Sequence, residues 1–422
     1  MAGKEVYREW RRRVRVAQRV EPADTVISGA RVLNVFTQQL RTADIAISDG
    51  IIAGVGQYPE ARERIELLGA VVAPSFIDAH VHIESSMLWV PQFARATVPR
   101  GTGAVLADPH EIANVAGFAG VKAMRKAAQD LPIRVHWMAP SSVPASPLES
   151  PGATFDLDDI KRMLAWPECA GLGEMMNFPA LLAGEREIFD KIVAANGLPR
   201  DGHSPGLRGS AVQAYAAAGI RSDHESTELD EAHDKLAAGM MLVLRQGSSE
   251  KNLLDLLPLV EDATWRRCTF GSDDRDAHDL LHNGHVDDVL RTVIAAGLDP
   301  VRALTMASWN AAQYMQEWTI GAIAPGFEAD LVVLDDDLRN LTVRETWFAG
   351  RCVARDGQYL VEEREAPLDT SLTHSVNIAP VHLSDLQLSW EDGTRAVGLV
   401  PDQIVTRTVE IDPPVRDGQV AA

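Results

Sequence analysis

The sequence predicts an α/β protein: a (β/α)8 TIM-like barrel with a small β-sandwich domain built from segments on both sides of the barrel. Short apolar runs alternate with amphipathic helical patterns between residues 73 and 317. Eight strand–helix repeats over roughly 250 residues match the size of such a barrel. Two turn-rich β segments, 24–72 and 318–362, flank this middle part. Hydrophobic residues make up 46% of the chain and charged residues 24%, which suits a large buried core.

The N-terminal segment 1–23 is predicted to be one amphipathic helix. It is rich in arginine, but it lacks the apolar stretch and cleavage site of a secretion signal. We expect Tyr7 and Trp10 to pack inward on this helix. In the first β segment, 26–33 and 43–52 are predicted to be extended, and Asp49-Gly50 is a hairpin signal within the second of them.

The middle part supplies eight predicted barrel strands, separated by helical patterns such as 114–130. These strands are 71–82, 103–108, 133–138, 169–174, 200–203, 220–224, 240–244 and 268–273. The second β segment contributes 329–334, 343–347, 350–353 and 359–361. The extension 363–422 is more polar, and edge strands are predicted at 386–388 and 406–411.

Charge and cysteine content exclude several classes of protein. Asp and Glu number 60 against 40 Lys and Arg, a formal charge of −20, which argues against binding nucleic acid or anionic membranes. No apolar run reaches the roughly 18 residues of a transmembrane helix. The 3 cysteines form no Cys-x-x-Cys pair, so neither a disulfide framework nor a thiolate zinc site is indicated. We therefore expect a cytoplasmic protein.

Metal-binding side chains stand at the carboxyl ends of several predicted strands, the face where barrel active sites lie. His80 and His82 are two residues apart, so a strand points both imidazoles to the same side. Such a pair alone is weak evidence for a metal site, but other strand ends carry Glu174, His203, His224 and Asp273. This set is sufficient for two divalent ions with Glu174 as the bridge. Mixed imidazole and carboxylate ligation suits Zn²⁺, Fe²⁺ or Mn²⁺.

Two segments carry a family resemblance. Residues 74–82 resemble the signature of the amidohydrolase superfamily, and 321–334 resemble its return into the β domain. Further segments are similar to the barrel-type bacterial adenine deaminases: 82–88, 108–115, 173–177, 201–206, 222–226 and 272–275. The resemblance implies metal ligation by the six strand-end residues.

The same resemblance places further polar residues near the mouth of the pocket. They are Glu84, Asp108, His110, Glu111 and Asn177. We expect Asp108, His110, Glu111 and Asn177 to contact substrate, although supporting hydrogen bonds or helix capping would equally explain these residues. Glu225 and His285 are open to the same two interpretations.

The implied reaction is hydrolytic deamination of adenine, a small purine, to hypoxanthine and ammonia. Asp273 would shuttle the proton of a metal-activated water, and Glu84 or Glu111 would protonate the ring. Alternatives are another amidohydrolase reaction on a heterocycle or cyclic amide, an inactive metal-binding variant, and peroxide disproportionation at a di-iron or di-manganese pair. We expect a homo-oligomer.

The sequence departs from the family pattern at its end. Members of the family continue into a further domain with a His-Asp-Ser-His-Asn segment, which this sequence lacks. We therefore expect 363–422 to be the start of a shortened or truncated domain, with the barrel ligands unaffected.

Overall fold

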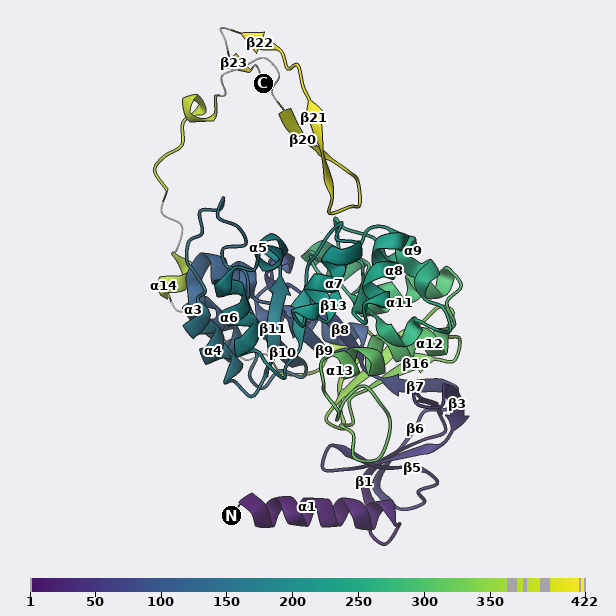
Figure 1. The fold of residues 1–422 in the computed structure, drawn as a ribbon. Coiled ribbons are helices and arrows are strands. Elements are labelled where there is room, and N and C mark those ends of the chain that lie inside the picture. Colours follow the sequence, from purple (N-terminus) through teal and green to yellow (C-terminus); the bar gives the residue numbers. More distant parts are fainter. Residues whose placement is uncertain (1, 363–369, 375–377, 388–394, 417–418, 421–422) are drawn as a thin grey trace.

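The computed structural model describes residues 2–362, 370–374, 378–387, 395–416 and 419–420. A central barrel is flanked by two β-sheets on one side and by the C-terminal segment on the opposite side (Figure 1). The N-terminal helix α1 (Ala2–Ala17) lies against the far side of the β-sheets.

The predicted helix 1–23 is present as α1 but ends at Ala17, and the predicted facing of its aromatic residues is wrong. Its docked face carries Val16, which is buried, and Arg12, whose guanidinium lies 2.5 Å from Asp24 and 2.9 Å from Asp49. Tyr7 and Trp10 are 65% and 63% exposed, so the expectation that they pack inward is wrong. At 100° per residue they project from a different face than Arg12 and Val16.

Two sheets form the β-rich part of the fold. The four-stranded sheet has the order β5-β4-β1-β6, and the seven-stranded sheet has the order β19-β18-β17-β16-β7-β2-β3. Their strands are β1 (Ala23–Ser28), β2 (Arg31–Asn34), β3 (Gln39–Thr42), β4 (Asp44–Ser48), β5 (Ile51–Gly56), β6 (Ala61–Glu66), β7 (Ala70–Pro74), β16 (Leu331–Asp335), β17 (Val343–Phe348), β18 (Arg351–Arg355) and β19 (Gln358–Tyr359). Ile27, Ile47, Val72, Leu331 and Trp347 belong to one buried cluster that both sheets share.

Turn residues decide how the first β segment divides. The predicted strand 26–33 is two strands in different sheets, because the chain turns at Gly29, where φ is +81°. Glycine adopts this left-handed conformation without a steric penalty. The predicted Asp49-Gly50 hairpin is confirmed, since both residues have positive φ and join the antiparallel strands β4 and β5.

The barrel strands lie at the eight predicted positions and pair in parallel within two sheets. They are β8 (Phe76–Val81), β9 (Thr102–Ala107), β10 (Arg134–Ala139), β11 (Cys169–Met175), β12 (Arg200–Gly202), β13 (Ser222–Asp223), β14 (Met241–Arg245) and β15 (Cys268–Gly271). A five-stranded sheet, β12-β11-β10-β9-β8, meets a three-stranded sheet, β13-β14-β15. A parallel bridge between Val81 and Asp273 joins β8 to β15, and Arg221 N donates to Arg200 O at 3.1 Å beside β12 and β13. The predicted first strand 71–82 divides at Ser75 into β7 and β8.

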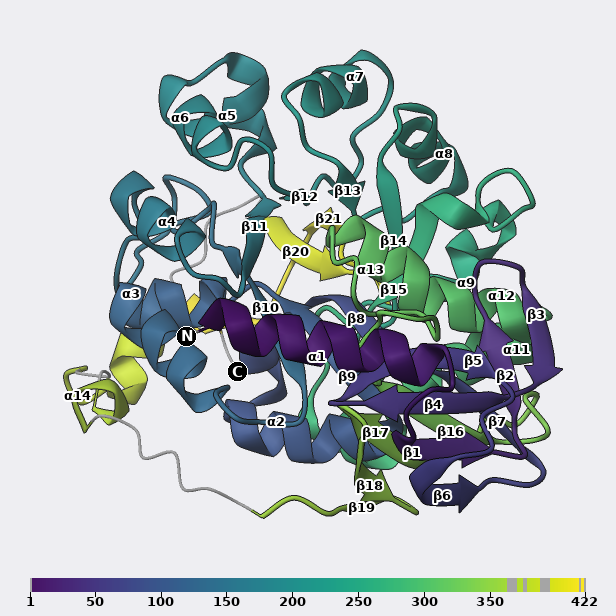
Figure 2. The ribbon, with the colours of Figure 1, turned by 90° about the horizontal axis from the view of Figure 1, so that it is seen from below.

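Helices surround the barrel strands (Figure 2). They are α2 (Val90–Thr97), α3 (His110–Ala127), α4 (Leu157–Leu164), α5 (Phe178–Ala183), α6 (Arg186–Ala194), α7 (Gly209–Ala217), α8 (Leu229–Ala237), α9 (Leu253–Leu256), α10 (Ala277–His282), α11 (Val286–Ala295), α12 (Pro300–Thr305) and α13 (Ala311–Tyr314). Short 3₁₀ or π turns are η1 (Ile83–Ser86), η2 (Val98–Arg100), η3 (Leu257–Leu259), η4 (Trp265–Arg267) and η5 (Met306–Asn310). Within the described ranges, no helix combines the length and apolar character needed to cross a bilayer.

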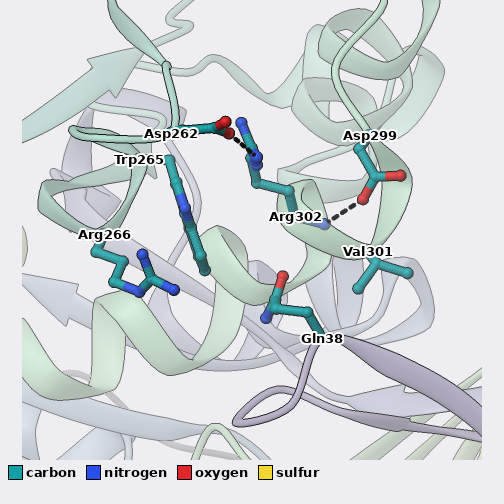
Figure 3. Close-up of a pocket in the computed structure, with 7 residues that line it drawn as sticks. All are labelled: Gln38, Asp262, Trp265, Arg266, Asp299, Val301 and Arg302. Atoms are coloured by element: carbon teal, nitrogen blue, oxygen red, sulfur yellow. Dashed lines mark hydrogen bonds and ion pairs between the residues drawn. The ribbon is translucent and has the colours of Figure 1, made fainter.

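A surface hollow of about 300 Å³ lies between the β2–β3 turn and helix α12 (Figure 3). Gln38 connects the turn to the helix, because its Nε2 donates to Val35 O at 2.7 Å and to Thr305 Oγ1 at 2.8 Å. The polar groups around the hollow largely satisfy one another. Arg302 donates to Asp262 at 2.5 Å, and Asp299 accepts from the backbone N of Arg302 at 2.9 Å. The hollow is therefore part of the contact between sheet and barrel.

The C-terminal segment begins with α14 (Thr370–Thr373) at the flank of the barrel, and its later part lies beyond the end opposite the β-sheets (Figure 1). It also contains η6 (Leu383–Leu386), β20 (Arg395–Leu399), β21 (Thr406–Glu410), β22 (Val415–Arg416) and β23 (Gln419–Val420). The predicted strand 406–411 is confirmed as β21, which pairs with β20. Of the predicted strand 386–388, Leu386 belongs to η6 instead, and residue 388 lies outside the described residues.

Candidate metal centre

The carboxyl ends of five barrel strands bring six predicted ligands into one cluster. They are His80, His82, Glu174, His203, His224 and Asp273. Four overlapping groups of three side chains have ligand atoms within 4.8 Å of one another, and these groups include His110 and Glu225 as well. Five of the six predicted ligands are buried, and His203 is half-buried.

His80 and His82 point their Nε2 atoms at each other across 3.1 Å. Nδ1 of His80 is 2.7 Å from Asp201 Oδ2, and Nδ1 of His82 is 2.9 Å from the carbonyl oxygen of Asp108. A carboxylate and a carbonyl oxygen accept hydrogen bonds, so both Nδ1 atoms carry the proton. In the neutral rings both Nε2 lone pairs then face the same space. A shared cation resolves this repulsion, so the pair fits a metal ion.

Glu174 lies between two sets of imidazoles. Its Oε1 is 3.3 Å from Nε2 of His82, while its Oε2 is 2.5 Å from Nδ1 of His203 and 3.1 Å from Nε2 of His224. Although burial opposes imidazolium formation, Glu174 and neighbouring carboxylates raise the pKa of His82 and of His224 well above the usual range. The same field attracts a divalent cation, and the two carboxylate oxygens face separate ligand groups.

Asp273 presents its two oxygens to different partners. Oδ1 is 3.1 Å from Nε2 of His82 and 3.7 Å from Nε2 of His80, while Oδ2 accepts from Arg245 Nη1 at 3.0 Å. Burial alone would raise the pKa of Asp273, but its hydrogen bond with His82 and the charges of His224 and Arg245 hold this pKa well below the usual range. The side chain is therefore an ionised carboxylate in contact with the cluster.

Glu84 and Glu111 lie beside the cluster at the start of α3. Glu84 Oε1 accepts from Ile112 N at 3.1 Å, and its Oε2 is buried with no hydrogen-bond partner among the described residues. Burial and the charge of Glu111 raise the pKa of Glu84 to about 7. Glu111 accepts from Ser85 Oγ at 2.7 Å, and burial raises its pKa too. Ser85 Oγ also lies within hydrogen-bond distance of Asp274 Oδ1, and its single hydrogen can point to only one of the two carboxylates at a time.

The other residues expected near the pocket mouth have local partners. Asp108 is buried, and its Oδ2 accepts from Glu174 N at 2.9 Å. A Cβ at Gly173 would lie 2.2 Å from this Oδ2, so the glycine allows the contact. His110 Nδ1 lies 3.4 Å from Glu174 Oε1, and burial with the charge of His82 lowers the pKa of His110 to about 3. Asn177 Oδ1 accepts from Ala180 N at 3.2 Å as the N-cap of α5.

Comparison with known proteins identifies the family. Residues 71–354 match the model of the Amidohydrolase family. The chain belongs to the amidohydrolase family. Among relatives, it is 44% identical over 410 residues to "Adenine deaminase" of Dehalococcoides mccartyi strain CBDB1, covering 97% of this chain and 72% of that protein. It is 41% identical to "Adenine deaminase 2" of Carboxydothermus hydrogenoformans, covering 96% and 71% of the two chains.

Solved structures share the fold of this amidohydrolase. D-aminoacylase superposes with a TM-score of 0.61 at 17% identity, covering 81% of this chain and 98% of that chain. The β-aspartyl dipeptidase of Fervidobacterium islandicum AW-1 gives a TM-score of 0.61 at 16% identity, covering 82% and 100%. At this identity the likeness concerns the fold alone, and it supports the TIM-like barrel.

Sequence reasoning missed several charged residues that support the amidohydrolase cluster. Asp201 orients His80, and Arg245 joins Glu225 to Asp273. Glu225, which the sequence left open, lies 3.5 Å from His203 Nδ1 and so belongs to the cluster. Asp201 lies in β12, and His203 follows two residues later, just past the end of that strand, a spacing that would point both side chains to one side of a continuing strand. His285, by contrast, lies 2.8 Å from Asp78 and 2.8 Å from Thr102 Oγ1, both outside the cluster.

A buried lysine holds the loops that carry His203 and His224. Lys235 Nζ donates to Asp223 at 2.7 Å, to Glu231 at 2.8 Å and to the carbonyl oxygen of Ser204 at 2.8 Å. Asp223 precedes His224, and Ser204 follows His203. One ammonium group therefore ties two ligand-bearing loops together.

We expect Lys235→Met to destabilise the fold by about 3–5 kcal/mol, because it leaves the buried carboxylates of Asp223 and Glu231 without their cation. Urea unfolding measures this change. Lys161→Met is the matched control: its side chain is 57% exposed, 3.7 Å from Asp158, and it should change the free energy of unfolding by less than about 0.5 kcal/mol. Equal stability of the two variants would contradict the role of Lys235.

Proposed function

We propose that this amidohydrolase deaminates adenine hydrolytically, producing hypoxanthine and ammonia. The supporting observation is the likeness to proteins named adenine deaminase, which reaches 44% identity along 97% of this chain. The strand-end cluster has the ligand types that a metal-dependent hydrolase requires. The substrate is accordingly a small purine.

We infer that two divalent ions bind the cluster. His80, His82 and Asp273 would hold one ion, His203 and His224 the other, and Glu174 would bridge them. The two oxygens of Glu174 facing separate imidazoles support this division. When bound, such a pair lowers the pKa of water from about 15.7 towards 7 and so provides hydroxide at neutral pH. Manganese, iron and zinc all suit imidazole and carboxylate ligands.

Asp273 is the proposed proton carrier. Its carboxylate takes one proton from the attacking water as the oxygen bonds to C6 of adenine. It then passes that proton to the amino nitrogen, and the C6–N bond breaks to release ammonia. Glu84 donates a proton to the ring nitrogen N1, with Glu111 as the alternative donor. The second proton of the water leaves to solvent, from which the ring donor is reprotonated.

The remaining polar residues have supporting roles in this proposal. Asp108, His110, Glu111 and Asn177 line the approach to the cluster and contact the purine. We also infer that residues 24–72 and 318–362 form a small β-sandwich domain and that 73–317 form the catalytic barrel. In this division 1–23 carry the N-terminal helix and 363–422 are an extension. A homo-oligomer and a cytoplasmic location stay predictions.

Ammonia release from adenine tests the proposal. Protein reconstituted with Mn²⁺, Fe²⁺ or Zn²⁺ should convert adenine to hypoxanthine with a kcat/KM at least roughly 10²-fold above that for guanine, cytosine or a cyclic amide. Chelator-treated protein is the control, and it should be inactive. Turnover of another heterocycle, with adenine left unchanged in every metal form, would contradict the proposed function.

A further inference from the structure

Arg245 lies between two carboxylates of the cluster because of the strand order. It ends β14, which lies between β13 and β15, and the loops after those neighbours carry Glu225 and Asp273. Its Nη1 donates to Glu225 Oε1 at 2.6 Å and to Asp273 Oδ2 at 3.0 Å. With Oδ2 held in this way, Oδ1 of Asp273 is the oxygen that faces His82.

Asn252 holds the other side of this guanidinium. Its Oδ1 accepts from Arg245 Nη2 at 2.9 Å, and both residues are fully buried. Arg245 Nε has no hydrogen-bond partner among the described residues. The orientation of the guanidinium therefore depends on Glu225, Asp273 and Asn252. Of these three, only Asn252 stands outside the metal cluster.

The C-terminal hairpin reaches Asn252. The turn between β20 and β21 contacts the barrel where Lys251 N donates to Asp402 O at 2.9 Å (Figure 1). There Asn252 Nδ2 donates to Gln403 Oε1, and Gln403 Nε2 donates to Asp255 Oδ2 at 3.2 Å. Arginine can only donate and an ionised carboxylate can only accept. The charged residues at the two ends therefore fix the orientation of both amides.

We propose that Asn252 and Gln403 are positioning residues for catalysis: they connect the C-terminal hairpin through Arg245 to the carboxylate of Asp273. The proposal rests on the proposed function, in which Asp273 carries the proton. Asn252 fixes the guanidinium, and the guanidinium fixes which oxygen of Asp273 faces the cluster. Gln403 acts one step further away, by fixing the amide of Asn252.

Three single variants and one double variant test this connection. Asn252→Ala should lower kcat for adenine on the order of 10-fold, the effect of losing one hydrogen bond to a charged group, with KM changed far less. Asn252→Asp keeps an acceptor for Arg245 and should restore most of kcat. Gln403→Ala should lower kcat less, and the double variant Asn252→Ala, Gln403→Ala should be no slower than Asn252→Ala alone, since the two act in series.

Two further measurements separate positioning from general structural support. The matched control is Leu254→Ala on the same helix, whose side chain is 51% exposed and which should leave kcat unchanged. Metal content must equal that of the unaltered protein. A crystal structure of Asn252→Ala should show Asp273 turned away from its contact with Arg245.

The outcomes are distinct. An unmoved Asp273 together with near-normal kcat in Asn252→Ala would overturn the proposal. Additive losses in the double variant, matched by equal losses in thermal stability, would also overturn it in favour of a structural role. Failure of the unaltered protein to deaminate adenine would instead reject the proposed function, and the orientation of Asp273 in the Asn252→Ala crystal structure would still test the connection itself.

Discussion

Replacing Asp273 with asparagine should lower kcat for adenine by roughly 10²–10⁴-fold, the range typical of losing a general acid–base group. The amide keeps the shape and one coordinating oxygen, but it cannot take up the proton of the attacking water. KM should change far less, because the lost interaction acts in the transition state. Steady-state kinetics with adenine, run beside metal analysis of the same preparation, measures both effects.

Asp274→Asn is the matched control for this experiment. Asp274 is the next residue, but its carboxylate accepts a hydrogen bond from Ser85 and belongs to none of the metal-binding groups of the cluster. It should therefore retain most of kcat. A metal-replete Asp273→Asn protein with near-normal kcat would move the proton carrier elsewhere, and a large loss in Asp274→Asn would identify the neighbouring carboxylate as that group.

The sequence was sufficient to predict the barrel because its strands follow local rules. Six of the eight predicted barrel strands end in a polar residue, and in a parallel barrel all carboxyl ends open on one face. His80 and Glu174 are far apart in the chain, yet both lie in the same cluster. Predicting the ligands therefore required only the position of each strand end. Their roles stay proposals.

Strand boundaries and side-chain facing depended on contacts that sequence patterns do not show. The apolar stretch 71–82 is continuous in sequence, but β7 pairs with β16 in the seven-stranded sheet, while β8 begins the barrel at Phe76. Helix α1 docks through the face that carries buried Val16 and Arg12, which pairs with Asp24 and Asp49. Such choices depend on partners distant in sequence.

The supporting charges were missed for the same reason. In the sequence Arg245 is an ordinary arginine at the end of an apolar strand. Its role becomes visible only through its hydrogen bonds to Glu225 and Asp273, which follow the two neighbouring strands. Lys235 lies within a helix, where a lysine is expected to be exposed to solvent, but its side chain is buried against Asp223. A charged residue at a strand end opposite predicted carboxylates was the available signal for Arg245.

Replacing Glu174 with glutamine should remove one metal ion and nearly all activity. Both oxygens of Glu174 face imidazoles, Oε1 towards His82 and Oε2 towards His203 and His224. Glutamine offers one acceptor oxygen, and its NH2 group only donates. A neutral amide oxygen bridges two cations far more weakly than a carboxylate whose two anionic oxygens each reach one of them, so Mn²⁺-reconstituted protein should fall from about two ions per chain to about one.

Glu225→Gln is the matched comparison, because Glu225 would contact only one of the two ions whereas Glu174 would bridge both. Glu225 Oε1 lies 3.5 Å from His203 and 3.4 Å from His224, but it reaches neither His80 nor His82 in any metal-binding group. If Glu174 is the bridge, Glu225→Gln should keep closer to two ions than Glu174→Gln does. A Glu174→Gln protein that still binds about two ions would reject the bridging role. A single ion in the unaltered protein would reject the binuclear centre itself, and the hydroxide would then have to form at one cation held by fewer charges.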